Sequence, residues 1–291
     1  MKILTNLSVL SILLGVQLVG AASVAHAATS PDLGAAKSFV ILSDTYTNTV
    51  AGTTLTGDLG YTTPPAVAPT VNGTTYAGGS TYNQAGIDQN TALSNLNSQP
   101  CTFNFAPGAI DLASDTTHGP VGVYTPGVYC ITGGDSVGGG GTITLSGAGT
   151  YIFRVDGALS TSANSVVTVA NGASICDVWW TPTQATTLGA DSTFLGTVIA
   201  ASGNTVGNNV NWTGRALSFG GTVSTAADTI TAPNCPVAAV SSPAAVSSPA
   251  ATPGLPNTGL GEQSSNTSSF IIGATAVVLS ITVLAFIRQK A

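Results

Sequence analysis

Residues 195–217 read LGTVIAASGNTVGNNVNWTGRAL, and this stretch decides the fold. It carries one charge, Arg215, while Gly, Ala, Ser, Thr and Asn fill most of the other positions. Such a composition would suit a flexible linker, but apolar residues such as Val198, Val206 and Trp212 recur through it. The stretch therefore predicts short strands joined by tight turns.

The stretch also contains a repeat, because FLGTVI at 194–199 is answered 18 residues later by WTGRAL at 212–217. Further segments fall into one column: GALSTSANS (157–165), QATTLGADS (184–192), GNTVGNNVN (203–211) and FGGTVSTAAD (219–228). Rungs of about 18 residues with three short strands are the signature of a β-solenoid. The inward-facing residues of this column would be Leu159, Leu188, Val206 and Val223. Asn204 also falls on an inward position, where an apolar residue is expected.

The rest of the globular part, about residues 30–236, is strand-like apart from two segments. Residues 61–78 are rich in Pro and Gly and read as an irregular cap. Residues 80–99 place apolar side chains at helical spacing, with Ser80 or Thr81 as a possible cap and Pro100 as a stop. The predicted class is mainly β, a solenoid with one long helix alongside. A β-sandwich is the alternative, since alternation alone does not separate the two.

The first 27 residues resemble a secretory signal, with Lys2, an apolar run and an Ala-His-Ala site at 25–27. A transmembrane anchor is the alternative. Export would place the four cysteines in an oxidising compartment and favours two disulfides over a metal site. Three pairings are possible. Proximity along the chain favours Cys101–Cys130 and Cys176–Cys235.

A Pro/Ala/Ser linker occupies residues 237–254. After it come three parts in order: LPNTG at 255–259, an apolar run at 270–287 and a basic tail at 288–291. This order resembles a cell-wall sorting signal, which implies sortase cleavage between Thr258 and Gly259 and attachment of Thr258 to peptidoglycan. A plain C-terminal membrane anchor is the alternative.

Composition argues against nucleic-acid binding and catalysis. Only 6% of residues are charged, and acids outnumber bases 12 to 6, so the chain lacks the basic clusters that displace counterions from nucleic acid. The only glutamate is Glu262, and the one histidine beyond the signal, His118, reads as a solvated loop residue. Arg154 and Asp156 form the only pair that suggests a catalytic group, and a surface salt bridge would explain them equally well. We predict no enzyme activity and no cofactor.

An ordered set of segments resembles the microbial ice-binding (antifreeze) protein family, which is built on a discontinuous right-handed β-solenoid. The segments are LGAAKSFVILSDT (33–45), LTGDLG (55–60), TPGVYC (125–130), YIFRVDGALST (151–161), VTVANGASICDVWW (167–180), FLGTVIA (194–200) and TGRAL (213–217). The resemblance implies that the first strands join one end of the solenoid and that the helix packs along one face. It also implies that another, flat face meets ice.

Carried over by position, the resemblance implies that the ice-facing residues are Tyr46, Asn48, Ser160, Ser162, Thr187, Thr205, Thr222 and Ser224. A solenoid face repeats at about 4.8 Å between strands and about 6.7 Å along a strand, close to oxygen spacings in ice. Small side chains keep such a grid flat, and Thr holds a methyl and a hydroxyl on a stiff χ1. Thr is also a good strand former anywhere, so the column alone does not prove ice binding. A cell-wall adhesin or glycan-binding module is the alternative function, and a purely structural wall protein is a third.

Overall fold

The computed structural model describes residues 27–138 and 140–235. The predicted linker, the LPNTG motif, the apolar run, the basic tail and all but the last residue of the predicted signal lie outside these residues. Within the described part, no helix is long and apolar enough to cross a bilayer.

The strands stack in parallel, and their pairings define three walls. The first wall contains β7 (Ile110–Asp111), β10 (Asp135–Val137), β13 (Leu159–Thr161), β16 (Thr186–Leu188), β18 (Asn204–Val206) and the C-terminal ends of β19 (Asn211–Thr225) and β1 (Phe39–Asn48). The second contains β8 (Val123–Tyr124), β11 (Thr142–Ser146), β14 (Val166–Ala170), the starts of β17 (Thr193–Ile199) and β19, then β20 (Thr229–Thr231), β2 (Thr54–Thr56) and β4 (Thr70–Asn72).

The third wall contains β6 (Phe103–Asn104), β9 (Gly127–Ile131), β12 (Tyr151–Val155), β15 (Val178–Pro182), the end of β17, the middle of β19, the start of β1, β3 (Asp58–Tyr61) and β5 (Thr75–Ala77). Two short 3-10 helices, η1 (Gly34–Ser38) and η2 (Ile175–Asp177), complete the elements with α1 (Ser80–Ser98). Parallel pairing throughout excludes the antiparallel β-sandwich.

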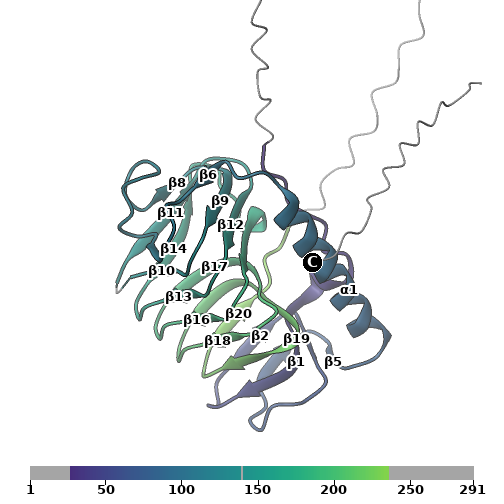
Figure 1. The fold of residues 1–291 in the computed structure, drawn as a ribbon. Coiled ribbons are helices and arrows are strands. Elements are labelled where there is room, and N and C mark those ends of the chain that lie inside the picture. Colours follow the sequence, from purple (N-terminus) through teal and green to yellow (C-terminus); the bar gives the residue numbers. More distant parts are fainter. Residues whose placement is uncertain (1–26, 139, 236–291) are drawn as a thin grey trace, which may run out of the picture. The chain divides into compact units, whose positions relative to one another are not determined.

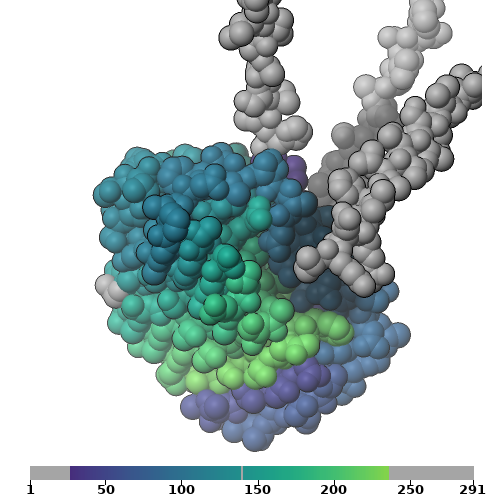
Figure 2. Space-filling view, in the orientation of Figure 1, coloured from purple at the N-terminus to yellow at the C-terminus, as the bar shows by residue number. Residues whose placement is uncertain are grey.

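The order of strands in the stack differs from their order in the chain. The strands before α1 pair with the last strands of the domain: β1 lies on β19, and β2 lies on β20. Figure 2 shows this order as bands, with teal and then green followed by the purple and blue N-terminal segment. The chain then runs through α1, and the strands that follow it, from β6 on, lie at the other end of the stack (Figure 1).

Neighbouring strands are not evenly spaced along the chain. Residues 18 apart pair between β17 and β19, for example Thr193 with Asn211, but 27 separate Tyr151 from Val178 and 24 separate Gly127 from Tyr151. The glycine shared by the repeated segments 194–199 and 212–217 has a steric cause. A Cβ on Gly214 would lie 1.9 Å from the Gly196 carbonyl oxygen. The repeated glycine lets two backbones approach closely at this turn.

Helix α1 covers the third wall. The predicted helix is present as Ser80–Ser98, but Gly79, and not Ser80 or Thr81, occupies the N-cap position. Its buried side includes Tyr82, Ala85, Ala92 and Leu96. These pack on outward-facing apolar residues of the third wall: Leu42, Val128, Ile152, Trp179, Ile199 and Leu217. Beneath α1 the third wall is therefore apolar on both faces, whereas α1 leaves the first and second walls uncovered.

The interior between the walls is apolar and holds a run of aromatic rings. The four predicted inward residues, Leu159, Leu188, Val206 and Val223, are all buried. The Phe153 ring stacks on Trp180 at 4.2 Å and on Tyr129 at 5.2 Å. These rings come from neighbouring strands of the third wall, so the stack fixes the inward face of three successive turns.

The predicted cap is more regular than its Pro and Gly content suggested. Residues 61–78 contain β4 and β5, which pair with β2 and β3 and extend two walls by one more turn. Pro64, Pro65 and Pro69 lie in the loop between β3 and β4, where no ladder hydrogen bond is needed.

Both predicted disulfides are present. Cys101–Cys130 joins the segment after α1 to β9, and Cys176–Cys235 joins η2 to the last described residue. The two bonds therefore fasten the end of the helix and the end of the domain to the stack.

We expect Phe153→Ala to lower the free energy of unfolding by about 3–5 kcal/mol, because it removes the ring that links Tyr129 and Trp180 and leaves a cavity. Thr142→Ala, an exposed change in the second wall, is the control and should change stability little. Urea denaturation of the protein measures both. A loss below about 1 kcal/mol for Phe153→Ala would contradict the proposed role of the stack.

Candidate functional site

Four of the eight predicted ice-facing residues stand in one row on the first wall. Ser160, Thr187, Thr205 and Ser224 are direct strand partners from β13 to β19. The row continues to residues that the sequence analysis missed, Ser136 at one end and Thr47 at the other. We call these six residues the hydroxyl row.

Two of the other predicted residues lie beside this row. Thr222 is exposed and pairs with Thr45, which forms a short second row. Ser162 is exposed just past the end of β13.

The remaining two predicted residues, Tyr46 and Asn48, point inward. The Tyr46 side chain is fully buried and Asn48 is 2% exposed, so neither can meet ice. The outward residues of this strand are Thr45 and Thr47. Between Ser43 and Thr45 the pairing with β19 shifts register by two residues, at the point where both strands pass from the third wall to the first, so the inward and outward positions of β1 have to be counted anew from Thr45.

Tyr46 and Asn48 belong instead to a buried polar junction between the first and second walls. Asn48 Oδ1 accepts hydrogen bonds from Thr53 (2.8 Å) and Thr225 (3.0 Å), and the Tyr46 hydroxyl bonds Thr225 Oγ1 at 2.8 Å. Asp228 accepts from the backbone N–H groups of Val210 and Ala226 at 2.8 and 2.7 Å. Burial raises the pKa of Asp228 to about 6, although these backbone bonds lower it. The junction ties β1, from the start of the chain, to the turn before β20.

The second wall carries a regular two-row array of outward side chains. Four successive strands each present a pair two residues apart: Asn211 and Thr213 on β19, Thr229 and Thr231 on β20, Thr54 and Thr56 on β2, and Thr70 and Asn72 on β4. Every member is a direct partner of the corresponding residue on the next strand. All eight are exposed or half-buried. We call these eight residues the threonine lattice.

Buried residues beneath the lattice hold it flat. The residue between each pair points inward: Trp212, Ile230 and Leu55 are fully buried, and Val71 packs against the same core. The lattice contains no charged side chain. Within the described residues, none of its eight side chains makes a hydrogen bond to the protein, so their polar atoms are free to bond water.

The hydroxyl row is less free. Thr47 bonds Ser224 at 2.6 Å, and Ser136 and Ser160 turn back to the carbonyls of Ile110 and Asp135 at 3.4 and 3.3 Å. The row also ends against Asp111, the strand partner of Ser136. Its geometry offers one complete row of polar groups, several of them already used.

The lattice has a defined boundary at β17. The row that contains Asn211 continues on the neighbouring strands through Thr193, Val166 and Thr142. The row that contains Thr213 stops at Leu195, which is 5% exposed and belongs to the core cluster against which Ala173 and Ile175 pack. The lattice therefore ends at β17, where the buried Leu195 stands in the row of Thr213.

The residues considered for catalysis have structural partners. The His118 ring is buried, which corrects the expectation of a solvated loop residue. Its Nδ1 lies 2.6 Å from Asp115 Oδ2 and its ring stacks on Tyr124 at 3.9 Å. Burial acts to raise the pKa of Asp115, but hydrogen bonds from His118 and Thr117 hold it below the usual value.

Arg154 and Asp156 do not form the expected salt bridge. Arg154 donates to the Gln99 carbonyl at 2.8 Å, and Asp156 accepts from Thr183 at 3.3 Å. Within the described part of the chain, no group of three or more His, Cys, Asp or Glu side chains is arranged to hold a metal.

Comparison with known proteins identifies the family to which this chain belongs. Residues 40–231 match the protein family described as ice-binding-like. The chain belongs to the ice-binding-like family. This match spans the three walls, the helix and the threonine lattice, so the family assignment covers the whole described stack.

Individual relatives and a solved structure support this family assignment. An ice-binding protein of Nostoc sp. (strain HG1) is 29% identical over 211 residues, which are 68% of this chain and 73% of that protein. Ice-binding protein K3-B1 of Typhula ishikariensis is 29% identical over 65% of this chain and 85% of its own length. The crystal structure of an ice-binding protein from the Antarctic ascomycete Antarctomyces psychrotrophicus superposes with a TM-score of 0.63 at 28% identity, over 71% of this chain and all of that one.

We expect the contribution of Asp228 to the free energy of unfolding to be largest below about pH 4 and to be lost as the pH rises from about 4 to 6. The folded-state pKa of Asp228 is raised to about 6 from 3.8, so the folded chain binds the proton more tightly than the unfolded chain across this window. Burial raises the pKa of Asp135 as well, which acts in the same direction. Asp228→Asn should make the melting temperature fall less steeply over this window.

The control is Asp191→Asn, because Asp191 is an exposed turn residue. Melting temperatures of the wild type and both variants between pH 4 and 7 give the slope for each protein and test this prediction. An unchanged slope in Asp228→Asn would contradict the assigned role of this carboxyl.

Proposed function

We propose that this protein binds ice through the threonine lattice of the second wall. The function is supported by the family and by relatives whose names describe ice binding. We infer further that the three walls form the right-handed β-solenoid that the family resemblance implies, and that the protein acts by adsorption and not as an enzyme. The single observation that carries the choice of surface is the pairing of four Thr/Asn doublets in exact strand register.

The lattice supplies a rigid grid of methyl and polar groups. Parallel strands place its members about 4.8 Å apart across the wall and about 6.7 Å apart along each strand. Each Thr side chain holds its methyl and hydroxyl on a stiff χ1, and burial of the central residue fixes the strand beneath it. Because the hydroxyls have no protein partner in the described structure, they can hold a layer of ordered water that an ice surface can share.

The hydroxyl row of the first wall is the weaker candidate for the main contact. It contains Ser160, Thr187, Thr205 and Ser224 from the original prediction, but only one complete row, and part of its hydroxyls bond to the protein. A single row fixes spacing in one direction, whereas two registered rows fix it in two. Thr222 and Ser162 add exposed polar groups without completing a second row.

The described surface gives little support to glycan binding. Aromatic side chains that stack on sugar rings would have to stand exposed in a row. Tyr46 and Tyr82 are buried, Tyr61 stacks on Tyr46 at 6.5 Å, and Tyr76 packs on Phe39 at 5.2 Å. These four tyrosines serve packing, which favours ice over a polysaccharide as the ligand.

We expect Thr229→Tyr to abolish most of the thermal hysteresis and ice-recrystallisation inhibition, because a large ring at the centre of the lattice breaks its flatness. Thr187→Tyr is the matched control: it introduces the same ring at an exposed strand position of the first wall. Circular dichroism confirms that both variants fold.

Loss of activity in Thr187→Tyr alone would move the ice surface to the hydroxyl row. Absence of ice activity in the folded wild type at high protein concentration would refute ice binding and favour the adhesin alternative.

We also propose that the protein is exported and held at the cell surface. The support is the sequence alone: a signal-like start at 1–27 and the ordered LPNTG motif, apolar run and basic tail at 255–291. Sortase would join Thr258 to peptidoglycan, with residues 270–287 in the membrane before cleavage. A surface-bound ice-binding domain would hold a cell to ice or shape the ice next to it.

We expect the chain to be released from the cell wall of a sortase-bearing host only by enzymes that digest peptidoglycan. Thr258→Ala should shift it from the wall fraction to the membrane fraction, because cleavage needs the bond between Thr258 and Gly259. Cell fractionation and immunoblotting test this. Equal wall attachment of wild type and Thr258→Ala would contradict the sortase proposal.

A further inference from the structure

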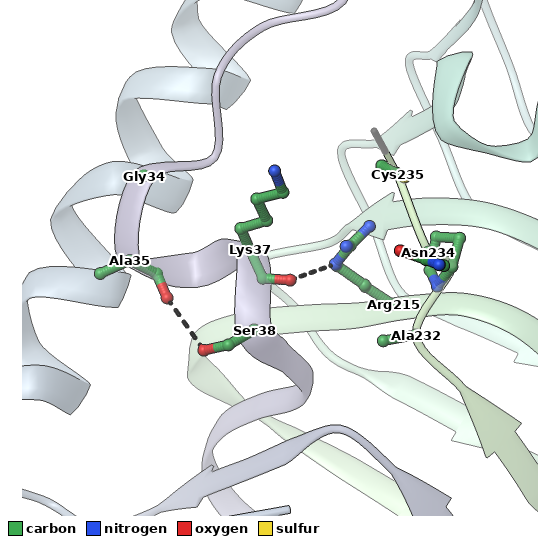
Figure 3. Close-up of a pocket in the computed structure, with 9 residues that line it drawn as sticks. Gly34, Ala35, Lys37, Ser38, Arg215, Ala232, Asn234 and Cys235 are labelled. Atoms are coloured by element: carbon green, nitrogen blue, oxygen red, sulfur yellow. Dashed lines mark hydrogen bonds between the residues drawn. The ribbon is translucent and has the colours of Figure 1, made fainter. Parts of the chain in front are cut away.

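A pocket lined by two cations lies away from both open walls. It is an open hollow of about 470 Å³ between η1 and the last described residues of the chain. Figure 3 shows the Lys37 and Arg215 side chains projecting into the same space, with Asn234 and Cys235 on its far side. Nothing in the ice-binding argument uses this pocket.

Arg215 is an unusual residue to find there. Its side chain is only 4% exposed, and its one hydrogen bond within the described structure runs from Nε to the Lys37 carbonyl at 2.9 Å. Burial lowers the pKa of Arg215 to about 10, so the group is still charged at neutral pH. Buried charges are normally paired, since removing an ion from water without a partner costs several kcal/mol.

The neighbouring carboxylates do not supply that partner. Asp32 accepts from the Gly34 N–H at 3.0 Å and Asp88 from the Ala35 N–H at 2.7 Å, so both serve the backbone of η1. Within residues 27–138 and 140–235 the one ion pair is His118 with Asp115, and neither of these residues lines the pocket. Lys37 and Arg215 are thus two positive charges at one hollow, and neither forms an ion pair with a carboxylate of the described chain; Asp32 and Asp88 stay bound to backbone N–H groups at its η1 edge.

We propose that this pocket binds a phosphate group, either as the free ion or at the end of a larger molecule. The outer nitrogens of the Arg215 guanidinium form a fork that matches two oxygens of a tetrahedral oxyanion. The Lys37 ammonium adds a second charge, so the pocket fits a dianion better than a single carboxylate. The hollow is open to solvent, which leaves room for a substituent on the phosphate.

Titration of inorganic phosphate into the protein at constant ionic strength, followed by backbone amide shifts, tests the proposal. We expect saturable shifts confined to η1 and to residues 232–235. Lys37→Gln should weaken binding by about two- to fivefold, as expected for loss of one partly exposed charge. Arg215→Lys keeps the charge but loses the fork, and it should weaken binding further.

Arg154→Gln is the matched control, because Arg154 is a cation at a different pocket and already donates to Gln99. It should bind phosphate like the wild type. If Arg215→Lys fails to fold, Lys37→Gln decides alone, since its half-buried side chain has no hydrogen bond in the described structure that the change would break.

Acetate and glycerol phosphate form the remaining arms. Binding of glycerol phosphate as well as inorganic phosphate would support a phosphate carried on a larger molecule, and binding of inorganic phosphate alone would support the free ion. Acetate binding as tight as phosphate would overturn the assignment to phosphate. Shifts that do not saturate, or equal affinity in wild type and Lys37→Gln, would overturn the site itself.

Discussion

The register of parallel strand pairing is the constraint on which the rest of the structure depends. Each backbone ladder fixes which side chains point inward, and one wall repeats that choice on every strand. Inside, the choice stacks Phe153 between the rings of Tyr129 and Trp180. Outside, the same choice aligns Thr213, Thr231 and Thr56 into a row. Core and surface are thus two results of one set of hydrogen bonds.

The threonine lattice exists because the two ends of the domain meet. Strands β19 and β20 come from its C-terminal part, and β2 and β4 come from its start. The buried junction of Asn48, Thr53 and Thr225 lies where these segments join. Asn48 Oδ1 can accept from both Thr53 and Thr225 only in this arrangement of strands, because any other pairing would separate the three buried side chains. We regard this junction as the device that holds the two halves of the lattice in register.

Sequence reasoning reached the class of fold, the helix, the disulfides and much of the inward pattern, because each of these leaves a local signal. Periodic apolar residues gave the helix at 80–99, and the repeated glycine of 194–199 and 212–217 gave adjacent strands. Asn204 was placed inward, and the structure supplies its partner, since its Nδ2 donates to Ser218 Oγ at 2.6 Å.

The surface was harder to predict, because it depends on contacts between distant segments. The doublets TLT (54–56), TVN (70–72), NWT (211–213) and TIT (229–231) are visible in the sequence, but nothing local shows that they are neighbours. The inversion of Tyr46 and Asn48 has a similar cause. Two steps along β1, from Ser43 to Thr45, match four steps along β19, from Ser218 to Thr222, so the sequence of β1 alone does not show which of its residues align with the outward row of β19.

The two open walls show why small hydroxyl side chains are not enough to make a binding surface. Both walls present Ser and Thr side chains on their outward faces, and both have exposed positions. On the first wall, Ser side chains reach back to carbonyls of the neighbouring strand, as Ser160 does to Asp135. On the second wall, the Thr and Asn side chains of the lattice make no such bond in the described structure. A hydroxyl that is satisfied by the protein holds water less firmly than a free one, so the lattice can order an ice-like layer that the hydroxyl row cannot order equally well.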